Sequence, residues 1–459
     1  MRTFLRVLLA LAIVAVIGLL LFIFIPPQTT EPHEDLAAGW QPEEGAGEYV
    51  MRLADCAACH TAEDGVQFAG GRPINSPLGV IYSANITPDD ETGIGDYSLD
   101  EFRAALYDGV REDGAHLYPA MPYDNYRFLT EEDVRALYLY FTTEVEPVSN
   151  PVPEPELGFP FDQRWALRAW KWVGLPEAER DVGGPGRYDD EQLNRGAYIV
   201  EGPGHCSACH SPRTQTFTQA GFTAEDPEFL TGGEIDGWTA PGLRGPDSPP
   251  QTWSGEELAR VLGTGRNAHA SVVGEMALVV EDSLQYLTAE DMQAVVAYLR
   301  HIGTDGPAPE DDADVPDEAE QVRAVDELVE NATAAMLSTA DPDMPLGARL
   351  YLDNCSACHM VDGRGADEVF PELDGSFLVT AAEPTGLIHM ILEGDELPST
   401  EERPMRLRMP GFGWRLSDAE VAELASFVRN AWSNDAGSVT AGMVADLREE
   451  HEGDQAAVE

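Results

Sequence analysis

The chain contains three related stretches: Cys56-Ala57-Ala58-Cys59-His60, Cys206-Ser207-Ala208-Cys209-His210 and Cys355-Ser356-Ala357-Cys358-His359. They use all six cysteines of the 459 residues and begin about 150 residues apart. Each is the attachment signature of a c-type haem, because two thiols three positions apart can bond to one edge of the haem. The histidine that follows is placed to bind the iron as its proximal ligand. The sequence therefore predicts three covalently bound haems.

A single Cys-x-x-Cys pair also occurs in zinc sites and in thioredoxin-like redox proteins. Here His follows each pair directly, and no second pair lies nearby to complete a four-thiolate zinc shell. The sequence therefore favours haem attachment over both alternatives. Since every cysteine is then committed to haem, we expect no structural disulfide.

An apolar run lies at the N-terminus. After Met1-Arg2-Thr3-Phe4-Leu5-Arg6 come 19 uninterrupted apolar residues, from Val7 to Ile25. This run is long enough to span a bilayer. A cleaved signal peptide is the alternative, but its apolar region is shorter and ends at small residues, which Ile25-Pro26-Pro27-Gln28 lacks. Because both arginines precede the run, we expect a retained anchor in the cytoplasmic membrane and the bulk of the chain on the periplasmic side.

The chain is strongly acidic, with 82 Asp and Glu against 28 Lys and Arg and a formal net charge of −54. So many carboxylates repel one another at low salt, and high ionic strength screens that repulsion. Nucleic-acid binding is excluded as a function, because phosphate backbones require patches of Lys and Arg. The charge is interpreted as a solvated acidic surface.

Three capped helices are predicted, beginning within Leu129–Val134, Leu287–Met292 and Leu416–Val421. In each, Thr or Ser is followed three residues later by an acidic residue, which is the arrangement of a capping box. Apolar residues then recur at helical spacing. These residues are Val134, Leu137, Tyr140 and Phe141; Met292, Val295, Tyr298 and Leu299; Val421, Leu424, Phe427 and Val428.

A second helical stretch precedes each haem motif and carries a glycine and an aromatic residue. The pairs are Gly47 with Tyr49, Gly196 with Tyr198, and Gly347 with Tyr351. Glycine permits a close approach of two helices, and the aromatic ring fills the crossing. A helix, Cys-x-x-Cys-His, a long loop and a capped helix are typical of class I cytochromes c. The predicted fold is therefore all-α, with three tandem class I cytochrome c domains behind an N-terminal transmembrane helix.

The repeats and the composition between them predict the domain boundaries. The predicted segments are an anchor or signal segment at 1–27, a linker at 28–45, cytochrome c domain 1 at 46–182, domain 2 at 187–303, an acidic linker at 304–340, domain 3 at 341–436 and an acidic C-terminal tail at 437–459.

A haem that passes electrons usually has Met or His as its sixth ligand, and Met raises the reduction potential. In the first domain Met121 is predicted, because prolines on both sides of the Ala120-Met121 pair restrict its loop; His116 is the alternative. In the third domain Met409 is predicted from Met409-Pro410-Gly411, and Met405 is the weaker candidate.

The second domain offers a less certain pattern. Met276 is the only Met between the second haem motif and the last predicted helix of that domain, since Met292 lies on the helix itself. It lacks a following proline, and His269 is the alternative ligand.

No catalytic constellation accompanies the haem motifs. The sequence shows no Ser-His-Asp candidate, no phosphate-binding glycine loop with a lysine and no nicotinamide fingerprint. A peroxidase-like activity would need an iron with an open site, and three predicted Met ligands argue against that. We therefore expect no catalytic residue and no substrate-oxidising activity in this chain itself.

Longer stretches of the chain are similar to a known family. They are Asn85-Ile86-Thr87-Pro88-Asp89, Leu117-Tyr118-Pro119-Ala120-Met121-Pro122-Tyr123, Phe159-Pro160-Phe161, Gly204-His205-Cys206-Ser207-Ala208-Cys209-His210-Ser211-Pro212-Arg213 and Met409-Pro410-Gly411-Phe412-Gly413-Trp414-Arg415-Leu416-Ser417-Asp418. With all three haem motifs in order, residues 45–450 resemble the trihaem cytochrome c subunit of bacterial membrane-bound alcohol dehydrogenases. Related subunits occur in gluconate, sorbitol and aldehyde dehydrogenases.

This resemblance implies electron transfer from a PQQ- or flavin-dependent catalytic subunit, acting on CH-OH donors, to ubiquinone or a terminal oxidase. The chain departs from the family in its long apolar N-terminal run and in its acidity. The alternative hypothesis is a self-standing, membrane-tethered multihaem electron carrier that serves an oxidase.

Overall fold

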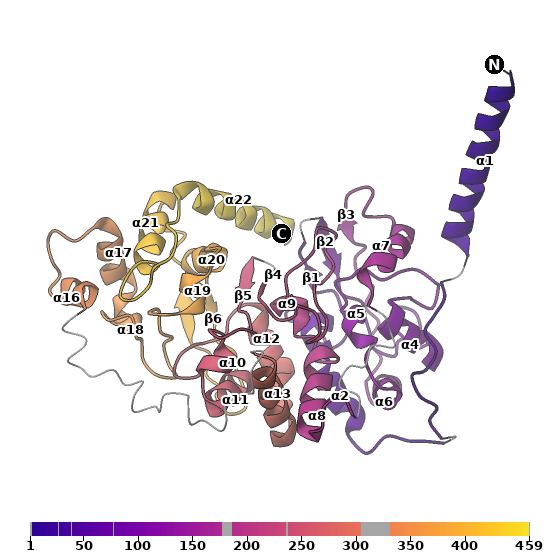
Figure 1. Ribbon diagram of the computed structural model, residues 1–459, viewed down its shortest axis with the longest axis horizontal. Helices are drawn as coiled ribbons and strands as arrows, with labels where there is room; N and C mark the ends of the chain where they lie inside the picture. The colour runs from indigo at the N-terminus through magenta and orange to yellow at the C-terminus, as the bar shows by residue number, and fades with distance from the viewer. Residues whose placement is uncertain are drawn as a thin grey trace. The chain divides into compact units, whose positions relative to one another are not determined.

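The computed structural model describes residues 2–25, 27–37, 39–76, 78–176, 186–235, 237–303 and 331–458 (Figure 1). Residues 304–330 of the predicted acidic linker lie outside these described residues, as do Pro26 and the end of predicted domain 1. The chain forms two compact units. Unit 1 comprises Met1–Val50 and Cys59–Arg180, and unit 2 comprises Met51–Ala58 and Asp181–Glu459.

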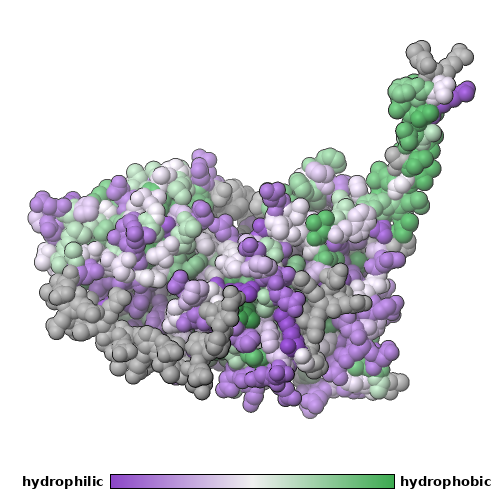
Figure 2. Space-filling model, in the orientation of Figure 1, coloured by the Kyte–Doolittle hydropathy of each residue, from purple (hydrophilic) through white to green (hydrophobic). Residues whose placement is uncertain are grey.

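Helices are the longest regular elements of the first 180 residues. The helices are α1 (Arg2–Phe24), α2 (Ala46–Leu53), α3 (Cys56–His60), α4 (Leu99–Asp108), α5 (Tyr123–Tyr126), α6 (Glu131–Thr143), the short 3₁₀ helix η1 (Arg164–Ala166) and α7 (Leu167–Gly174). Three short strands, β1 (Pro73–Ile74), β2 (Gly79–Tyr82) and β3 (Glu156–Leu157), form an antiparallel sheet in the order β1-β2-β3. Helix α1 is apolar along its length (Figure 2) and is one candidate membrane span among the described residues, by length and composition.

The rest of the chain repeats this helical character twice. Around the second motif lie α8 (Glu191–Glu201), α9 (Ser207–His210), α10 (Pro249–Thr252), α11 (Gly255–Thr264), α12 (Glu275–Asp282), η2 (Leu284–Tyr286) and α13 (Ala289–His301), with the hairpin β4 (Gly233–Ile235) and β5 (Trp238–Ala240). Around the third lie α16 (Ala332–Ser338), α17 (Leu346–Asn354), α18 (Ser356–His359), α19 (Phe377–Thr380), α20 (Thr385–Glu393), α21 (Asp418–Val428) and α22 (Ala441–Val458), with the hairpin β6 (Gly394–Glu396) and β7 (Arg408–Pro410).

The predicted capped helices are confirmed. Thr130, Thr288 and Ser417 are the N-caps of α6, α13 and α21, and each side chain accepts a hydrogen bond from the backbone N–H three residues later. Ser417 forms the full reciprocal capping box with Glu420. At the second helix the acid at this position, Asp291, pairs instead with Arg195 of α8 at 2.7 Å. The apolar positions point inward, as shown by the burial of Leu137, Tyr298 and Leu424.

The three predicted glycines all lie at tight helix crossings. A Cβ atom added to Gly47 would lie 2.5 Å from the Ala136 carbonyl oxygen of α6. The corresponding distances are 2.1 Å from Gly196 to the Ala294 oxygen of α13 and 2.3 Å from Gly347 to the Glu423 oxygen of α21. In each crossing the second close atom is the Cβ of the aromatic residue four positions further on: Tyr140, Tyr298 and Phe427. The first and last helix of each repeat therefore meet in the same way.

Replacing Gly196 with Ala should destabilise unit 2. Its Cβ would meet the Ala294 oxygen at 2.1 Å and the Tyr298 Cβ at 2.6 Å, so α8 and α13 would have to separate. Overpacking of this kind costs about 1–3 kcal/mol, which should lower the melting temperature in calorimetry. Gly255→Ala in α11 is the matched control, because its nearest neighbour is 3.5 Å away. An equal melting temperature for both variants would contradict the tight crossing.

The structure adds contacts at the predicted linker 28–45 and at the predicted tail. Thr30, in the predicted linker 28–45, donates backbone and side-chain hydrogen bonds to the Asp108 carboxylate, each at 2.7 Å. The predicted acidic C-terminal tail contains α22, and Val444 is buried in the third core. Nε of Arg448 in α22 lies 2.8 Å from Oδ1 of Asp418, and this ion pair holds the helix in place. The three small sheets are a further addition to the all-α prediction, and each consists of strands of only two to four residues.

Candidate haem sites

Each Cys-x-x-Cys-His motif forms a single helical turn directly after a longer helix. The turns are α3, α9 and α18. Residues three positions apart lie on one face of a helix, so the two thiols of each motif can face the same edge of a ligand. Cys59 and Cys358 are exposed, and the other four cysteines are partly buried. The local geometry therefore fits a haem held through two thioether bonds.

The motif histidines share one orientation. Nδ1 of His60 lies 2.6 Å from the Ala84 carbonyl oxygen, Nδ1 of His210 lies 2.8 Å from that of Pro241, and Nδ1 of His359 lies 3.0 Å from that of Pro371. Because a carbonyl oxygen only accepts, Nδ1 carries the proton and Nε2 is left as the lone-pair donor. A second bond of this kind is typical of metal-binding histidines, since it fixes the ring and the tautomer.

The electrostatics of the three motifs also fit haem. Burial lowers the pKa of His60, His210 and His359 below the usual value, which favours the neutral ring that binds a metal. Redox-active Cys-x-x-Cys pairs have a lowered thiol pKa. Here burial raises the pKa of the Cys206 thiol to about 12 and that of Cys355 to about 12. The thioredoxin-like alternative is therefore disfavoured.

Met121 lies in a loop that leads into α5. Its carbonyl accepts from the Tyr123 N–H at 2.8 Å, and its own N–H donates to Tyr118. The alternative ligand His116 is 7% exposed, and its Nδ1 lies 3.0 Å from Nζ of Lys171. Burial, with the Lys171 charge, lowers the His116 pKa to about 4. The histidine is thus engaged with a lysine, which favours Met121 as the ligand of the first site.

Met276 is the second residue of α12. The cap of that helix, Gly274, has φ of 60° and lies against the Trp238 ring, where an added Cβ would come within 2.7 Å. Trp238 begins β5, and this strand leads to Pro241, whose carbonyl accepts from His210. The structure thus brings the Met276 loop and the His210 partner loop together. The alternative ligand His269 stacks its ring on Trp253, with centroids 5.4 Å apart.

Replacing Met276 with Leu should remove the sulfur-to-iron absorption in the near infrared at the second site. With three Met-ligated sites, the band should lose about a third of its intensity, because Leu offers iron no lone pair. His269→Gln is the matched control and should keep the full band. Optical spectra of both oxidised variants measure this. If instead Met276→Leu leaves the band intact and His269→Gln changes the spectrum, His269 is the ligand.

Met409 lies at the centre of β7 and is partly buried. Its register partner on β6 is Asp395. The backbone at Gly394, whose φ is 67°, lies close to the backbone at Met409 and Gly411. A Cβ added to Gly394 would lie 2.1 Å from the Met409 carbonyl oxygen. The alternative, Met405, is 69% exposed. The backbone around Met409 is thus held in one position, which a fixed axial ligand requires.

The candidate ligand segments of the second and third sites are directly connected. The Gly274 N–H, two residues before Met276, donates to Oδ2 of Asp395 at 2.6 Å. Asp395 is also the register partner of Met409. One side chain therefore joins the loop of one candidate ligand to the strand of the other. No pattern in the sequence marks this role, since Asp395 is one acid among 82 Asp and Glu.

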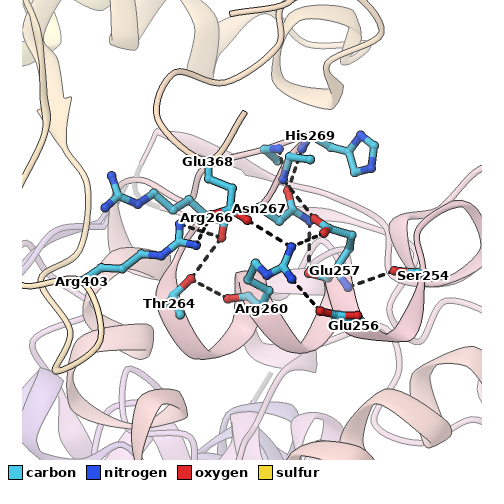
Figure 3. Close-up of polar contacts among 12 residues, drawn as sticks. Ser254, Glu256, Glu257, Arg260, Thr264, Arg266, Asn267, His269, Glu368 and Arg403 are labelled. Atoms are coloured by element: carbon cyan, nitrogen blue, oxygen red, sulfur yellow. Dashed lines mark hydrogen bonds and ion pairs between the residues drawn. The ribbon is translucent and has the colours of Figure 1, made fainter. Parts of the chain in front are cut away.

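Salt bridges hold the second and third haem regions together within unit 2 (Figure 3). Glu368, in the loop after the third motif, pairs with Arg260 of α11 at 3.1 Å and with Arg403 at 2.6 Å. Arg406 pairs with Glu281 of α12 at 2.7 Å. A single exposed ion pair contributes only about 0–1 kcal/mol to the stability of the fold, whereas a network of pairs holds its side chains in place more firmly. Arg260 and Arg406 thus link the second haem region to the third through ion pairs with Glu368 and Glu281.

Comparison with known proteins agrees with these sites. The cytochrome c family matches residues 193–303 and 345–432, which contain the second and third motifs. The gluconate 2-dehydrogenase cytochrome c subunit of Pantoea cypripedii is 40% identical over 412 residues, which cover 88% of this chain and 89% of that protein. The cytochrome c subunit of the quinone alcohol dehydrogenase of Gluconobacter oxydans is 40% identical, with 88% and 81% covered.

A third relative is the fructose dehydrogenase cytochrome subunit of Gluconobacter japonicus, 38% identical over 92% of this chain and 85% of that subunit. Each of these three likenesses covers 88% or more of this chain. The resemblance inferred from the sequence is confirmed. The chain is an electron-transferring cytochrome c, and it belongs to the family of cytochrome c subunits of dehydrogenases.

Proposed function

We propose that this chain consists of three tandem class I cytochrome c domains and carries three haems. The residues that would hold them are Cys56, Cys59, His60 and Met121; Cys206, Cys209, His210 and Met276; Cys355, Cys358, His359 and Met409. Haem c supplies reversible one-electron chemistry when bound. The observation that carries the proposal is the threefold recurrence of a motif histidine bonded through Nδ1 to a carbonyl, beside a glycine helix crossing.

The chain would relay electrons from a catalytic dehydrogenase subunit to ubiquinone or a terminal oxidase. The relatives named above are subunits of gluconate, alcohol and fructose dehydrogenases, which supports a PQQ- or flavin-dependent partner. The link from the Met276 loop through Asp395 to Met409 supports a short route between the second and third sites. Since the partner would oxidise the substrate, this chain's residues are assigned no substrate chemistry.

Helix α1 would be a retained anchor that holds the remaining chain on the periplasmic side of the cytoplasmic membrane. Its span, Thr3–Phe24, has a mean hydropathy of 3.3 and no burial against the rest of the chain. A signal sequence has the same properties. The cation–π and hydrogen-bond contacts of its last turn with Arg168 favour retention, because cleavage would discard them.

A tagged full-length chain purified from membranes of its own host tests the proposal. We expect three haems per chain in a pyridine haemochrome assay, none of them extractable by acid acetone. We also expect a large PQQ- or flavin-containing subunit to co-purify. Two haems per chain would refute haem attachment at one of the three motifs. Purification without a dehydrogenase subunit under every mild condition would support the self-standing carrier instead.

A further inference from the structure

Large apolar side chains are exposed along one short stretch of unit 1. This apolar patch consists of Phe159, Phe161, Trp165, Trp172 and Val173. Phe159 is 83% exposed, Trp172 73% and Val173 72%. Outside α1 and Ile25, which directly follows it, Val66 is the other exposed large apolar residue among the described residues of unit 1. Contiguous exposed apolar residues of this kind mark a binding surface, whereas scattered ones need no explanation.

Helix α7 presents its charged side to the protein and its apolar side to the outside. Lys171, the only lysine of the chain, is 8% exposed, and its Nζ donates to the carbonyls of Asp108 at 2.5 Å and Gly109 at 2.7 Å. The next two residues, Trp172 and Val173, are exposed. This is the reverse of a surface helix in water. An apolar environment outside the protein would explain it.

The patch is continuous with the end of α1. The Phe22 ring lies 5.3 Å from the Trp172 ring and 6.4 Å from the Trp165 ring, measured between centroids. Nη1 of Arg168 donates to the carbonyls of Phe22 at 2.8 Å and Ile25 at 2.7 Å. The last carbonyls of a helix have no intrahelical partner, so Arg168 satisfies them. Helix α7 is thus fixed beside the end of α1 (Figure 1).

The length of α1 determines the depth of the apolar patch relative to the bilayer. Its 23 residues span about 35 Å at a rise of about 1.5 Å per residue, and the hydrocarbon core of a bilayer is about 30 Å thick. If α1 crosses the bilayer, Phe22 therefore lies at the boundary between acyl chains and headgroups. Trp172, in contact with Phe22, lies at the same level, where Trp residues are enriched in membrane proteins.

Charge also favours a lipid surface at this position. Residues 159–176 contain one acid, Asp162, and two bases that are not buried, Arg164 and Arg168; the third base, Lys171, faces the protein. The whole chain has a formal net charge of −54, so most of its surface is repelled by anionic lipids. This segment differs from the acidic average of the chain, because it combines local positive charge with exposed aromatic rings. Both features are those of elements that lie in the membrane interface.

We propose that the apolar patch lies in the headgroup region of the bilayer, so that unit 1 rests on the membrane surface beside the end of α1. The proposal rests on the proposed retention of α1. Its consequence is that His60 and Met121, the proposed iron ligands of the first site, which share unit 1 with the patch, are held close to the membrane. A lipid-soluble acceptor such as a quinone would then approach this unit from the bilayer.

Photo-crosslinking to lipid tests the patch. The full-length haem-loaded chain is reconstituted in vesicles of phosphatidylethanolamine and phosphatidylglycerol with a phospholipid that carries a photoreactive group near its headgroup. Mass spectrometry should find lipid adducts on residues 159–173, at about ten times or more the level at Val66, since interfacial residues contact the headgroups directly. The double variant Trp172→Glu with Val173→Glu should lose most adducts at 159–173, whereas Val66→Glu should change nothing.

Adducts on α1 alone would overturn the proposal and leave the anchor in place. The proposal would also be overturned if the catalytic subunit protected the patch from a water-soluble label and lipid did not. The intact mass of the reconstituted sample shows separately whether α1 is present. If α1 is absent and residues 159–173 still gain adducts, the patch binds the membrane without the anchor. If α1 is absent and residues 159–173 gain no adducts, both the retained anchor and the membrane-bound patch are refuted.

Discussion

Replacing Cys355 and Cys358 together with Ala should lower the haem content from three per chain to two. Both thioether positions of the third motif are lost, and its haem cannot be attached covalently. The third core should lose stability, because it would lose the packing that the proposed haem contributes. The residues of that core lie between Leu337 and Val444, including Tyr351, Ile388 and Val421. Pyridine haemochrome assays and mass spectrometry of the purified variant measure the loss.

The first two sites should remain loaded in that variant. The buried residues of the third core come from the third region alone, so its loss leaves the α8–α13 crossing untouched. Ser356→Ala is the matched control: it changes the same helical turn but removes only a hydrogen bond to the Leu352 carbonyl. It should keep three haems. A double cysteine variant that retained three haems would show that the third motif is not an attachment site.

The sequence predicted the elements that repeat. The Thr or Ser caps, the helical apolar spacing and the glycine crossings all recur, and a pattern that occurs three times is recognised more securely than one that occurs once. Gly47, Gly196 and Gly347 meet Ala136, Ala294 and Glu423 in the same geometry. Local chemistry determines these features, which is why they can be read without a structure.

The partners of the motif histidines could not be predicted from spacing. The carbonyls of Ala84, Pro241 and Pro371 lie 24, 31 and 12 residues after their histidines. Any backbone carbonyl can accept such a bond, so the residue type carries no signal. The loop path between motif and partner decides the pairing. The same holds for Asp395, whose bond to the Gly274 N–H spans 121 residues.

The contacts of the predicted linker at 28–45 and of the C-terminal tail could not be predicted for a different reason. Composition marks these segments as connections, but a few side chains within them make specific contacts. His33 stacks on Tyr107 with centroids 4.6 Å apart, and Val444 is fully buried. Composition averages over a segment and hides such single contacts. The burial of individual residues, which only the fold reveals, decides whether a segment is packed.

Replacing Met409 with Leu should lower the reduction potential of the third site and slow the relay. The thioether favours ferrous iron, and Leu cannot coordinate it. Axial ligands tune haem potentials over about 0.8 V in total, so a fall on the order of 0.1 V is a modest expectation. Such a fall makes electron transfer to this site about 50-fold less favourable, at about 59 mV per factor of ten for one electron. Potentiometric titration followed optically measures the shift.

The structure makes Met409→Leu a clean test of the ligand. The β6–β7 pairing fixes the backbone of residue 409 through Asp395, and Leu is close to Met in volume, so the strand should be retained. The open iron should then bind carbon monoxide or cyanide, and quinone-reductase turnover of the complex should fall although the dehydrogenase site is unchanged. Met405→Leu is the matched control, because Met405 is 69% exposed and four residues away. An unchanged spectrum, potential and turnover in Met409→Leu, with a change in Met405→Leu, would move the ligand to Met405; no change in either would remove this site from the relay.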